Sequence, residues 1–343
     1  MKNVLITGVT GQDGSYLSKL LLDKGYRVFG THRRTSSIVV WRLEYLNIIN
    51  HPNFVLLEID LTDLSSILRC IKQSNPEIIF NLAAQSFVAH SFNSPITTAE
   101  ITGVGVLNVL EAIRLSDKRI KFYQASSSEM FGKVKEVPQN ELTPFHPRSP
   151  YGVAKVFGHW ATVNYRESYD IFAVSGILFN HESPLRGMEF VTRKITSNLA
   201  KIKIGKTEKF SLGNIYAKRD WGYAKDYVQA MWLMLQKKIP EDYVIATNKS
   251  YSVKFFSDLV LKALKFNYKW VGKGINEKAI DKLTRKPLIK INKKFYRPAE
   301  VNFLKGSYKK AKNQLKWRPK TSIKELVKIM VDFELKNSSY KNS

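Results

Sequence analysis

The chain begins with an apolar run and a glycine-rich turn, Val4-Leu5-Ile6-Thr7-Gly8-Val9-Thr10-Gly11-Gln12-Asp13-Gly14. The aliphatic and β-branched residues predict a buried strand, and the amphipathic stretch that follows predicts a helix. Gly8 permits a tight turn, Gly11 lets the backbone approach a phosphate, and Gly14 lets the helix pack closely on the strand. Because a helix amino terminus carries partial positive charge, this unit is expected to hold a dinucleotide.

Strand-like and helix-like segments alternate as far as about residue 175, which predicts the α/β class with a Rossmann-type, doubly wound parallel sheet. Further strands are expected at 27–31, 54–58, 77–81, 120–125 and 171–177. After residue 177 the loops lengthen and the helices stand apart, so we expect a smaller, interleaved C-terminal substrate lobe. The expected domains are a nucleotide-binding domain at 1–178, completed by segments around 211–250, a lobe at 179–335 and a frayed tail at 336–343.

A second stretch combines four reactive side chains. The expected strand at 120–125 delivers Ser127 and Glu129 to its carboxyl edge, where open parallel sheets place their active sites. Tyr151 and Lys155 follow a proline-bounded stop signal and are four residues apart, which puts them on one face of the next helix. A neighbouring lysine can lower the pKa of a tyrosine, so the group suits the removal of a hydride and a proton from one sugar. An exposed Tyr/Lys pair on an amphipathic helix is the alternative.

The end of the second strand indicates which dinucleotide is bound. An acid normally stands there to bind the ribose hydroxyls, but here His32-Arg33-Arg34 follows the strand. Two arginines favour a 2′-phosphate, so NADP is the expected cofactor, with a solvated basic loop as the alternative. Asp60-Leu61 and Leu82-Ala83-Ala84-Gln85 come just after other strands, where adenine, ribose and nicotinamide contacts would fall. As alternatives, Asp60 caps a helix near Thr62 and the alanines serve tight packing.

The expected lobe contains a polar loop and three cations. Asn-His-Glu-Ser-Pro at 180–184 is turn-rich and follows a buried strand directly, and such loops usually face a cleft. Lys194, Arg219 and Arg297 could clamp a diphosphate, since arginine makes bidentate contacts with phosphate. Structural ion pairs with Asp220 or Glu300 are the alternative.

Composition supports a chain with one large core and excludes some partners. Of the 343 residues, 44% are hydrophobic, which is enough for one large core and a smaller lobe. The 55 basic and 29 acidic residues give a formal net charge of +26, and residues 261–343 supply 23 basic against 6 acidic residues. These lysines alternate with Leu, Ile and Val at helical spacing, without a nucleic-acid motif. We expect a solvated surface that attracts a nucleotide diphosphate, and no nucleic-acid partner.

The cysteine, histidine and hydropathy patterns bear on the cellular compartment of the protein and on whether it binds a metal. The single Cys70 excludes an internal disulfide, and no apolar run reaches the roughly 18 residues of a membrane span. The six histidines show no metal-ligand spacing. With the first strand starting almost at residue 1 and no signal peptide, we expect a cytoplasmic protein with no membrane contact and no metal.

These motifs resemble the extended short-chain dehydrogenase/reductase group, in the NAD-dependent epimerase/dehydratase family, and within it the GDP-mannose 4,6-dehydratases. The matching runs cover nearly the whole chain and lie at 6–17, 32–36, 81–86, 122–129, 147–155, 176–184, 190–196, 212–227, 244–247 and 295–301. The most selective are Asn-His-Glu-Ser-Pro at 180–184, Phe-Val-Thr-Arg-Lys at 190–194 and Arg-Pro-Ala-Glu-Val at 297–301. They separate this family from its epimerase relatives.

The resemblance implies a lyase that converts GDP-mannose into GDP-4-keto-6-deoxymannose and water, with NADP taking a hydride from C4 and returning it to C6. It implies that Tyr151 removes the C4 hydroxyl proton, while Lys155 lowers the pKa of Tyr151 and holds the nicotinamide ribose. Ser127 would bond the C4 oxygen, and Glu129 would take the C5 proton and protonate the departing C6 hydroxyl. A homodimer or homotetramer is also implied.

The family's binding positions carry over residue by residue. The cofactor positions match Gly8, Gly11, Gln12, Asp13, Arg33, Arg34, Ser36, Asp60, Leu61, Ala84, Ser86, Tyr151, Lys155, His181 and Arg186. The substrate positions match Ser86, Asn180, Lys194, Arg219, Arg297 and Glu300.

Three alternatives stay open. The substrate could be a related GDP-sugar such as GDP-heptose. The reaction could be that of a nucleotide-sugar 4-epimerase or reductase, although neither needs an acid at Glu129. A basic, non-catalytic binding protein on the same scaffold would have no use for Ser127, Glu129, Tyr151 and Lys155 together.

Overall fold

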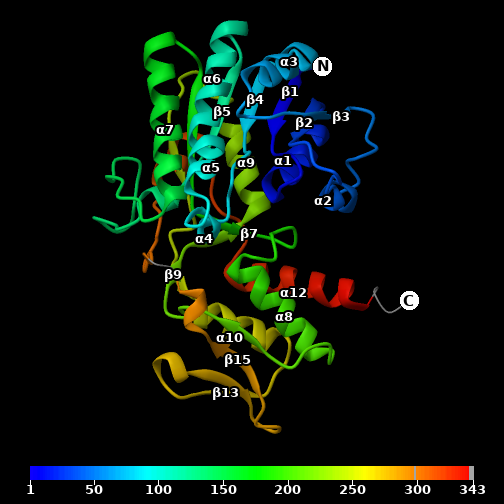
Figure 1. Cartoon of the computed structure of the whole chain (residues 1–343), viewed down its shortest axis with the longest axis vertical. Helices are drawn as coiled ribbons and strands as arrows, with labels where there is room; N and C mark the ends of the chain where they lie inside the picture. The colour runs from blue at the N-terminus through cyan, green and yellow to red at the C-terminus, as the bar shows by residue number, and fades with distance from the viewer. Residues whose placement is uncertain (297–298, 340–343) are drawn as a thin grey trace.

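The computed structural model describes residues 1–296 and 299–339. It consists of an upper body, which contains the amino terminus and a large parallel sheet, and a lower lobe formed mostly by later residues (Figure 1). This architecture is the α/β fold with a smaller C-terminal lobe that the sequence predicts.

The body is built on a seven-stranded parallel sheet in the order β11-β6-β5-β4-β1-β2-β3. The strands are β1 (Asn3–Thr7), β2 (Arg27–His32), β3 (Phe54–Glu58), β4 (Ile78–Asn81), β5 (Lys121–Ser127), β6 (Ala173–Leu178) and β11 (Tyr243–Ile245). The six strands expected before residue 178 are all present. Because the chain leaves β1 first toward β2 and later toward β4, the strand order reverses at β1, where open α/β sheets form their ligand crevice.

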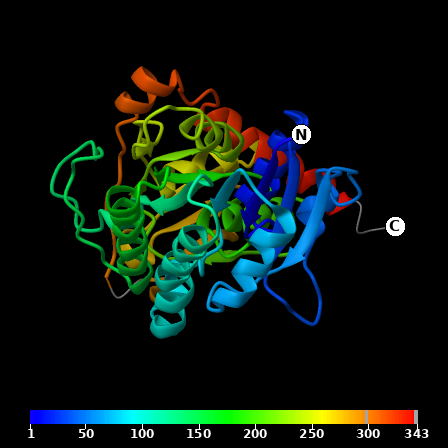
Figure 2. The ribbon, with the colours of Figure 1, turned by 90° about the horizontal axis from the view of Figure 1, so that it is seen from above.

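Helices cover both faces of this sheet, which lies between them when the body is seen from above (Figure 2). The core on one face of the sheet includes Leu17, Val228 and Trp317. The core on the other face includes Ile67 and Val109. The first layer contains α1 (Gln12–Asp23), α2 (Trp41–Tyr45), α9 (Ala224–Met234) and α11 (Lys309–Leu315), and the second contains α3 (Leu64–Ser74), α6 (Gly105–Ser116) and α7 (Pro150–Tyr169).

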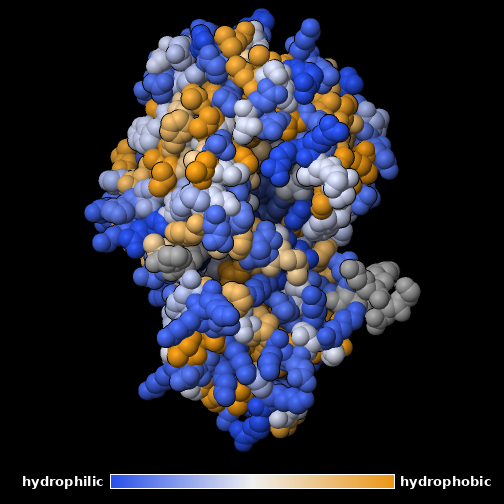
Figure 3. All heavy atoms as spheres, in the orientation of Figure 1, coloured by the Kyte–Doolittle hydropathy of each residue, from blue (hydrophilic) through white to orange (hydrophobic). Residues whose placement is uncertain are grey.

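The lobe packs three helices against a four-stranded sheet in the order β13-β14-β15-β8. The strands are β8 (Phe210–Leu212), β13 (Tyr268–Val271), β14 (Lys278–Asp281) and β15 (Pro287–Ile291), and the helices are α8 (Val191–Lys203), α10 (Val253–Ala263) and α12 (Ile323–Ser339). Two short pairs lie near the junction with the body: β7 (Asn180–Glu182) with β10 (Trp221–Tyr223), and β9 (Lys218–Arg219) with β12 (Tyr251–Ser252). The visible surface of the lobe is largely hydrophilic (Figure 3), and Lys269, Lys273 and Lys278 are among its exposed residues.

The remaining short helices lie between these elements. They are α4 (Val88–Ser91), α5 (Pro95–Ala99), η1 (Glu100–Val104), η2 (Ser128–Met130), η3 (Gly274–Asn276) and η4 (Lys293–Phe295). Among them, α4 and η2 follow β4 and β5 and therefore stand at the carboxyl edge of the sheet.

The boundaries of the two parts differ from those expected in three places. Strand β8 pairs with β15 and belongs to the lobe, whereas α9 and β11 belong to the body. Helix α11 and Trp317 return to the body, where the indole of Trp317 donates to the carbonyl of Asp226 at 2.8 Å. Helix α12 continues to Ser339, with Leu335 packed on the lobe core, so the expected tail is helical at 336–339, and its residues 340–343 lie outside the described part of the chain.

Within the described residues, one continuous helical stretch, Pro95–Ser116, is long and apolar enough to cross a membrane. This differs from the expectation that no such run exists. Its most apolar window has a mean hydropathy of 1.3, and half of that window is buried inside the fold. Helix α6 packs on α3 and α7, and core helices of folded proteins have the same composition, so the stretch is weak evidence for a span.

Candidate active site

The glycine turn presents the amino terminus of α1 at the crevice beside β1. Gly8 has a φ of +69°, and a Cβ built on it would lie 2.9 Å from Ala83 Cα. A Cβ on Gly14 would lie 2.5 Å from the carbonyl oxygen of Gly8. No side chain caps α1, whose N-cap is Gly11. The first turn of α1 is therefore open for the phosphates of a dinucleotide, and the residues present fit such a group.

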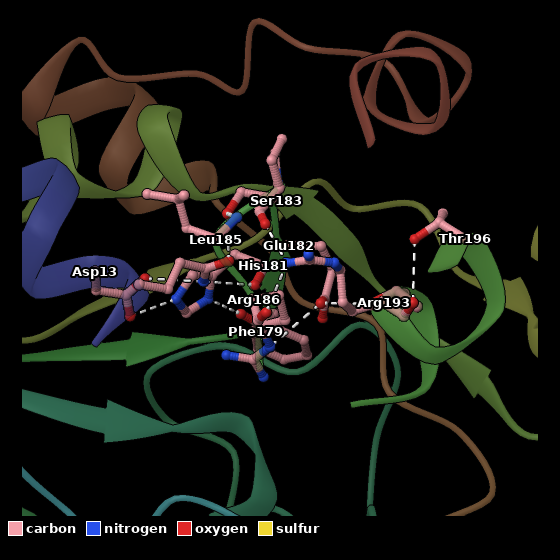
Figure 4. Close-up of polar contacts among 12 residues, drawn as sticks. Asp13, Phe179, His181, Glu182, Ser183, Leu185, Arg186, Arg193 and Thr196 are labelled. Atoms are coloured by element: carbon pink, nitrogen blue, oxygen red, sulfur yellow. Dashed lines mark hydrogen bonds and ion pairs between the residues drawn. The ribbon is translucent and has the colours of Figure 1, made fainter. Parts of the chain in front are cut away.

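Two polar residues of the first turn of α1 bind the segment around β7 (Figure 4). The Nε2 of His181 lies 2.7 Å from Oδ2 of Asp13, and its Nδ1 lies 2.7 Å from the carbonyl oxygen of Phe179. Gln12 donates to the carbonyl of His181 at 3.1 Å and accepts from Ser183 at 2.6 Å. These bonds join three of the expected cofactor positions into one buried network.

Strand β5 and helix α7 bring the expected catalytic residues together. Ser127 ends β5, and its Oγ accepts from the backbone N–H of Glu129 at 3.2 Å. Helix α7 begins after the N-cap Ser149, which puts Tyr151 in its first turn. A Cβ on Gly152 would lie 2.9 Å from the carbonyl oxygen of Glu129, so α7 packs directly on η2. Ser127, Glu129 and Tyr151 line one cavity of about 480 Å³.

Burial dominates the electrostatics of Tyr151 and Lys155. Burial raises the pKa of Tyr151 to about 12, against a hydrogen bond from Ser127 that lowers it. Burial also lowers the pKa of Lys155 to about 8, and the ammonium donates to the carbonyl of Ala125 at 2.6 Å. The expected lowering of the Tyr151 pKa by Lys155 is therefore not the main influence here, since Lys155 Nζ lies 5.7 Å from the phenol ring centroid and bonds elsewhere.

The lobe closes the other side of the cavity with cationic and polar groups. The ammonium of Lys194 lies 3.6 Å from the ring centroid of Phe295, and burial lowers the pKa of Lys194. Asn180 Oδ1 is buried without a hydrogen-bond partner among the described residues. Such a group next to a cavity is suited to accept a bond from a ligand. Lys194 and Asn180 both line the cavity.

Arg219 and Glu300 form an ion pair at 3.2 Å, which was one of the alternatives for the cations of the lobe. Asp220 is bonded elsewhere, because it accepts from the backbone N–H of Thr247 at 2.8 Å. Arg219 and Glu300 still line the cavity together. Arg297 lies outside the described residues.

The other expected cofactor positions stand at strand ends around the same crevice. Arg33, Arg34 and Ser36 are exposed after β2. Asp60 follows β3 and accepts from the backbone N–H of Thr62 at 2.9 Å, although α3 begins only at Leu64 with Asp63 as its cap. Thus Asp60 forms a turn and does not cap the helix.

Leu61, Ala84, Ser86 and Arg186 complete the set of expected positions. Leu61 is buried and lies against Gly105, and Ala84 follows β4. Ser86 and Arg186 line the cavity. The guanidinium of Arg186 lies 3.5 Å from the ring centroid of Phe190.

Sequence reasoning assigned no role to Glu182, which the structure places in the cavity wall. Glu182 is 2% exposed, accepts from the hydroxyl of Thr192 at 2.5 Å and pairs with Arg186 at 3.2 Å. The sequence signal that could have indicated Glu182 is an acidic residue inside the polar motif at 180–184, directly after a buried strand.

In the part of the chain that the structure describes, no group of three His, Cys, Asp or Glu side chains could hold a metal ion.

Comparisons with known proteins identify the family of the chain. Residues 5–330 match the family model of GDP-mannose 4,6 dehydratase. The chain is 51% identical over 341 residues to GDP-mannose 4,6 dehydratase of Homo sapiens, covering 96% of this chain and 91% of that protein. It is 48% identical over 339 residues to GDP-mannose 4,6-dehydratase of Sinorhizobium fredii (strain HH103), covering 97% of both.

Solved structures with the same fold are more distant in sequence. UDP-glucose 4-epimerase of Thermotoga maritima superposes with a TM-score of 0.81 at 25% identity, covering 98% of this chain and 99% of that one. dTDP-glucose 4,6-dehydratase of Bacillus anthracis superposes with a TM-score of 0.82 at 21% identity, covering 99% of this chain and 98% of that one. By its family model and its close relatives, the chain belongs to the GDP-mannose 4,6-dehydratase family.

Proposed function

We propose that this protein converts GDP-mannose into GDP-4-keto-6-deoxymannose and water. The observation that carries the proposal is that Glu129 lines the same cavity as Ser127 and Tyr151. A 4-epimerase or reductase exchanges hydrogen at C4 alone and needs no second acid. An elimination across C5 and C6 needs a group that removes the C5 proton, and Glu129 is the acid in this cavity that we assign to that step.

The cofactor expected at the glycine turn is NADP, which when bound would accept the C4 hydride and later deliver it to C6. The open first turn of α1 suits its pyrophosphate, and the exposed Arg33 and Arg34 after β2 suit a 2′-phosphate. No acid follows β2 to bind free ribose hydroxyls. These features of the chain favour NADP over NAD.

Tyr151 is proposed to remove the C4 hydroxyl proton as the hydride leaves. With a pKa of about 12 the phenol is protonated at neutral pH, so its deprotonated form must be stabilised when the site is filled. The Ser127 hydrogen bond already acts in this direction. The ammonium of Lys155, on the same helical face, would stabilise a phenolate by its charge.

Glu129 is proposed to act in the next step. Oxidation at C4 acidifies the C5 hydrogen, which leaves as a proton to the Glu129 carboxylate. The same carboxyl group then protonates the departing C6 hydroxyl, which leaves as water. When the hydride returns to C6, C5 needs a proton, and the phenol of Tyr151 would return the one that it took from the C4 hydroxyl. Glu129 is 6% exposed, and such a buried carboxyl group is shielded from exchange with bulk water while it carries the proton.

The side of the cavity that the lobe forms is proposed to bind the GDP diphosphate. Lys194 and Arg219 line the cavity from α8 and β9, and the positively charged lobe attracts a polyanion. Arg297 is proposed as a third cation from the sequence resemblance. The ion pair with Glu300 would hold the Arg219 guanidinium in place before the nucleotide arrives.

We infer that two copies associate through the surface of α5, η1 and α7. Large apolar side chains are exposed there, including Val104 at 43%, Phe157 at 48% and Trp160 at 55%. The η1 and α5 segments pack along α7, so these side chains belong to one surface. A contiguous apolar surface of this kind typically marks an interface, and a second copy of the chain presents the matching helices.

We infer a cytoplasmic location, which suits the cysteine content. Cys70 is buried and forms no disulfide. A chain that depends on no disulfide is suited to a reducing compartment.

Replacing Glu129 by Gln should reduce formation of the keto-sugar about 10²–10⁴-fold, because the amide cannot accept the C5 proton. GDP-mannose binding should stay within about threefold, since no charge of the diphosphate site is altered. Product is measured by mass as loss of one water, and binding by calorimetry. The exposed Glu167→Gln serves as the control; full turnover in Glu129→Gln would remove this residue from the mechanism.

NADP should bind at least tenfold more tightly than NAD, about 1.4 kcal/mol, because Arg33 and Arg34 favour the 2′-phosphate. Calorimetry with each cofactor measures the ratio. The double variant Arg33→Ala/Arg34→Ala should lose most of this preference, while the exposed Arg318→Ala should keep it. Equal affinities in the unmodified protein would contradict the assignment of NADP.

Replacing Lys155 by Met should abolish turnover yet stabilise the unliganded fold by about 1–3 kcal/mol at pH 7, since one pKa unit is about 1.4 kcal/mol. The folded pKa of Lys155, about 8, lies below the unfolded pKa of 10.5, so the fold penalises the protonated form. The loss of folding free energy caused by protonated Lys155 is therefore complete below pH 8 and decreases as the pH rises toward 10.5. Denaturant unfolding at pH 7 and pH 10 measures the difference, with the exposed Lys72→Met as control; a destabilised variant at pH 7 would contradict it.

The unmodified protein should have the mass of two or more chains of 39.4 kDa in solution. Trp160→Glu should give single chains, because a charge is costly to bury in an apolar interface. Size-exclusion chromatography with light scattering measures the mass at micromolar concentration. Leu142→Glu, at a site that is 90% exposed in a loop, should leave the mass unchanged. A monomeric unmodified protein would show that this surface is not a self-association site.

A further inference from the structure

The ring of His181 has two close partners that both accept hydrogen bonds. Its Nδ1 lies 2.7 Å from the carbonyl oxygen of Phe179, and its Nε2 lies 2.7 Å from Oδ2 of Asp13. Neither partner can donate unless the carboxylate is protonated. A neutral imidazole has one N–H and one lone pair, so it would point that lone pair at an oxygen at hydrogen-bond distance. The contacts of the ring are drawn in Figure 4. With Asp13 ionised, only the imidazolium can donate to both oxygens.

The surroundings of His181 suit a cation that is already paired. The ring is buried and stacks on Tyr227 of α9, with centroids 4.6 Å apart and an angle of 23°. The charged groups that act on it are Asp13 of α1 and Arg186, which follows β7. Burial and Arg186 lower the pKa of His181, but the charge and hydrogen bond of Asp13 outweigh them, so the net direction is upward.

Asp13 places a negative charge at the expected phosphate site. It stands in the first turn of α1, where the pyrophosphate of a dinucleotide is expected to bind. Burial is the main cause of the raised pKa of Tyr151 and of the lowered pKa of Lys155, and the negative charge of Asp13 acts upward on both pKa values. Arg186 offsets part of this charge. A carboxylate without its imidazolium would still repel the phosphates and hinder loss of the Tyr151 proton at neutral pH.

We propose that His181 is an imidazolium at neutral pH that cancels the charge of Asp13, and thereby permits phosphate binding at α1 and proton removal by Tyr151. His181 is then a positioning residue that acts through Asp13 and does not touch the reacting atoms. The part of this inference that concerns Tyr151 rests on the proposed function. The protonation state of His181 does not.

The protonation state is measured on the unliganded protein by NMR with ¹⁵N-labelled histidine. The signals of His181 are identified by their loss in His181→Asn. Between pH 7 and 8, both ring nitrogens should resonate as protonated nitrogens, and both should do so in the absence of cofactor and sugar. One protonated and one unprotonated nitrogen in that range would overturn the proposal, whatever the activity of the enzyme.

Charge compensation is tested with His181→Asn, Asp13→Asn and the double variant. Asparagine at 181 keeps a donor for Asp13 but has no charge, so this single variant should bind NADP at least tenfold more weakly. The pH profile of its turnover should also move to higher pH, because the Asp13 charge, then offset only by Arg186, raises the pKa of the Tyr151 base. His51→Asn, in the loop after α2, is the control.

The double variant separates charge from structure. Once Asp13 has lost its charge, the imidazolium is no longer needed. NADP affinity and the pH profile of the double variant should therefore return to within about threefold of those of Asp13→Asn. If the double variant is no better than His181→Asn, the histidine has only a structural role and the proposal fails. NADP affinity requires no sugar, so this result also stands apart from the identity of the substrate.

Discussion

The active site depends on two places where backbones approach too closely for a Cβ atom. Gly8 faces Ala83 at the end of β4, and Gly152 faces the carbonyl of Glu129 at the end of β5. The first contact holds the phosphate-binding turn against the sheet, and the second holds the start of α7. Because protein interiors are close-packed, neither element can shift without moving the strand edge beneath it. The cofactor site and Tyr151 therefore share one rigid frame.

The segment around β7 connects this frame to the lobe. On one side, His181 and Gln12 bind it to the first turn of α1. On the other side, the guanidinium of Arg193 in α8 donates to the carbonyls of Pro184 and Arg186 and pairs with Glu334 of α12. A short polar run thus bonds to both halves and carries Glu182 and Arg186 into the cavity between them. Buried polar groups bonded on both sides give such a junction one defined geometry.

Much of the fold and of the site could be predicted because its signals are local. The glycine turn, the strand that delivers Ser127, and the Tyr151–Lys155 spacing each depend on a few neighbouring residues. Glu182 was missed because its partner Thr192 comes from the next helix, and no periodic pattern encodes that contact. The choice of partner for Arg219 stayed open for the same reason. The pKa of Tyr151 is governed by burial, which only the assembled fold determines.

The path of the chain after the lobe has a consequence for biosynthesis. Trp317 packs into the core of the body, and Asp226 of α9 accepts from its indole and from the backbone of Lys320 and Thr321. During translation, the hydrophobic face of the sheet that α1 and α9 cover stays incomplete until residue 317 has left the ribosome. A nascent chain that already carries the whole glycine turn and the Tyr151 helix would therefore still expose apolar surface of the kind that chaperones shield.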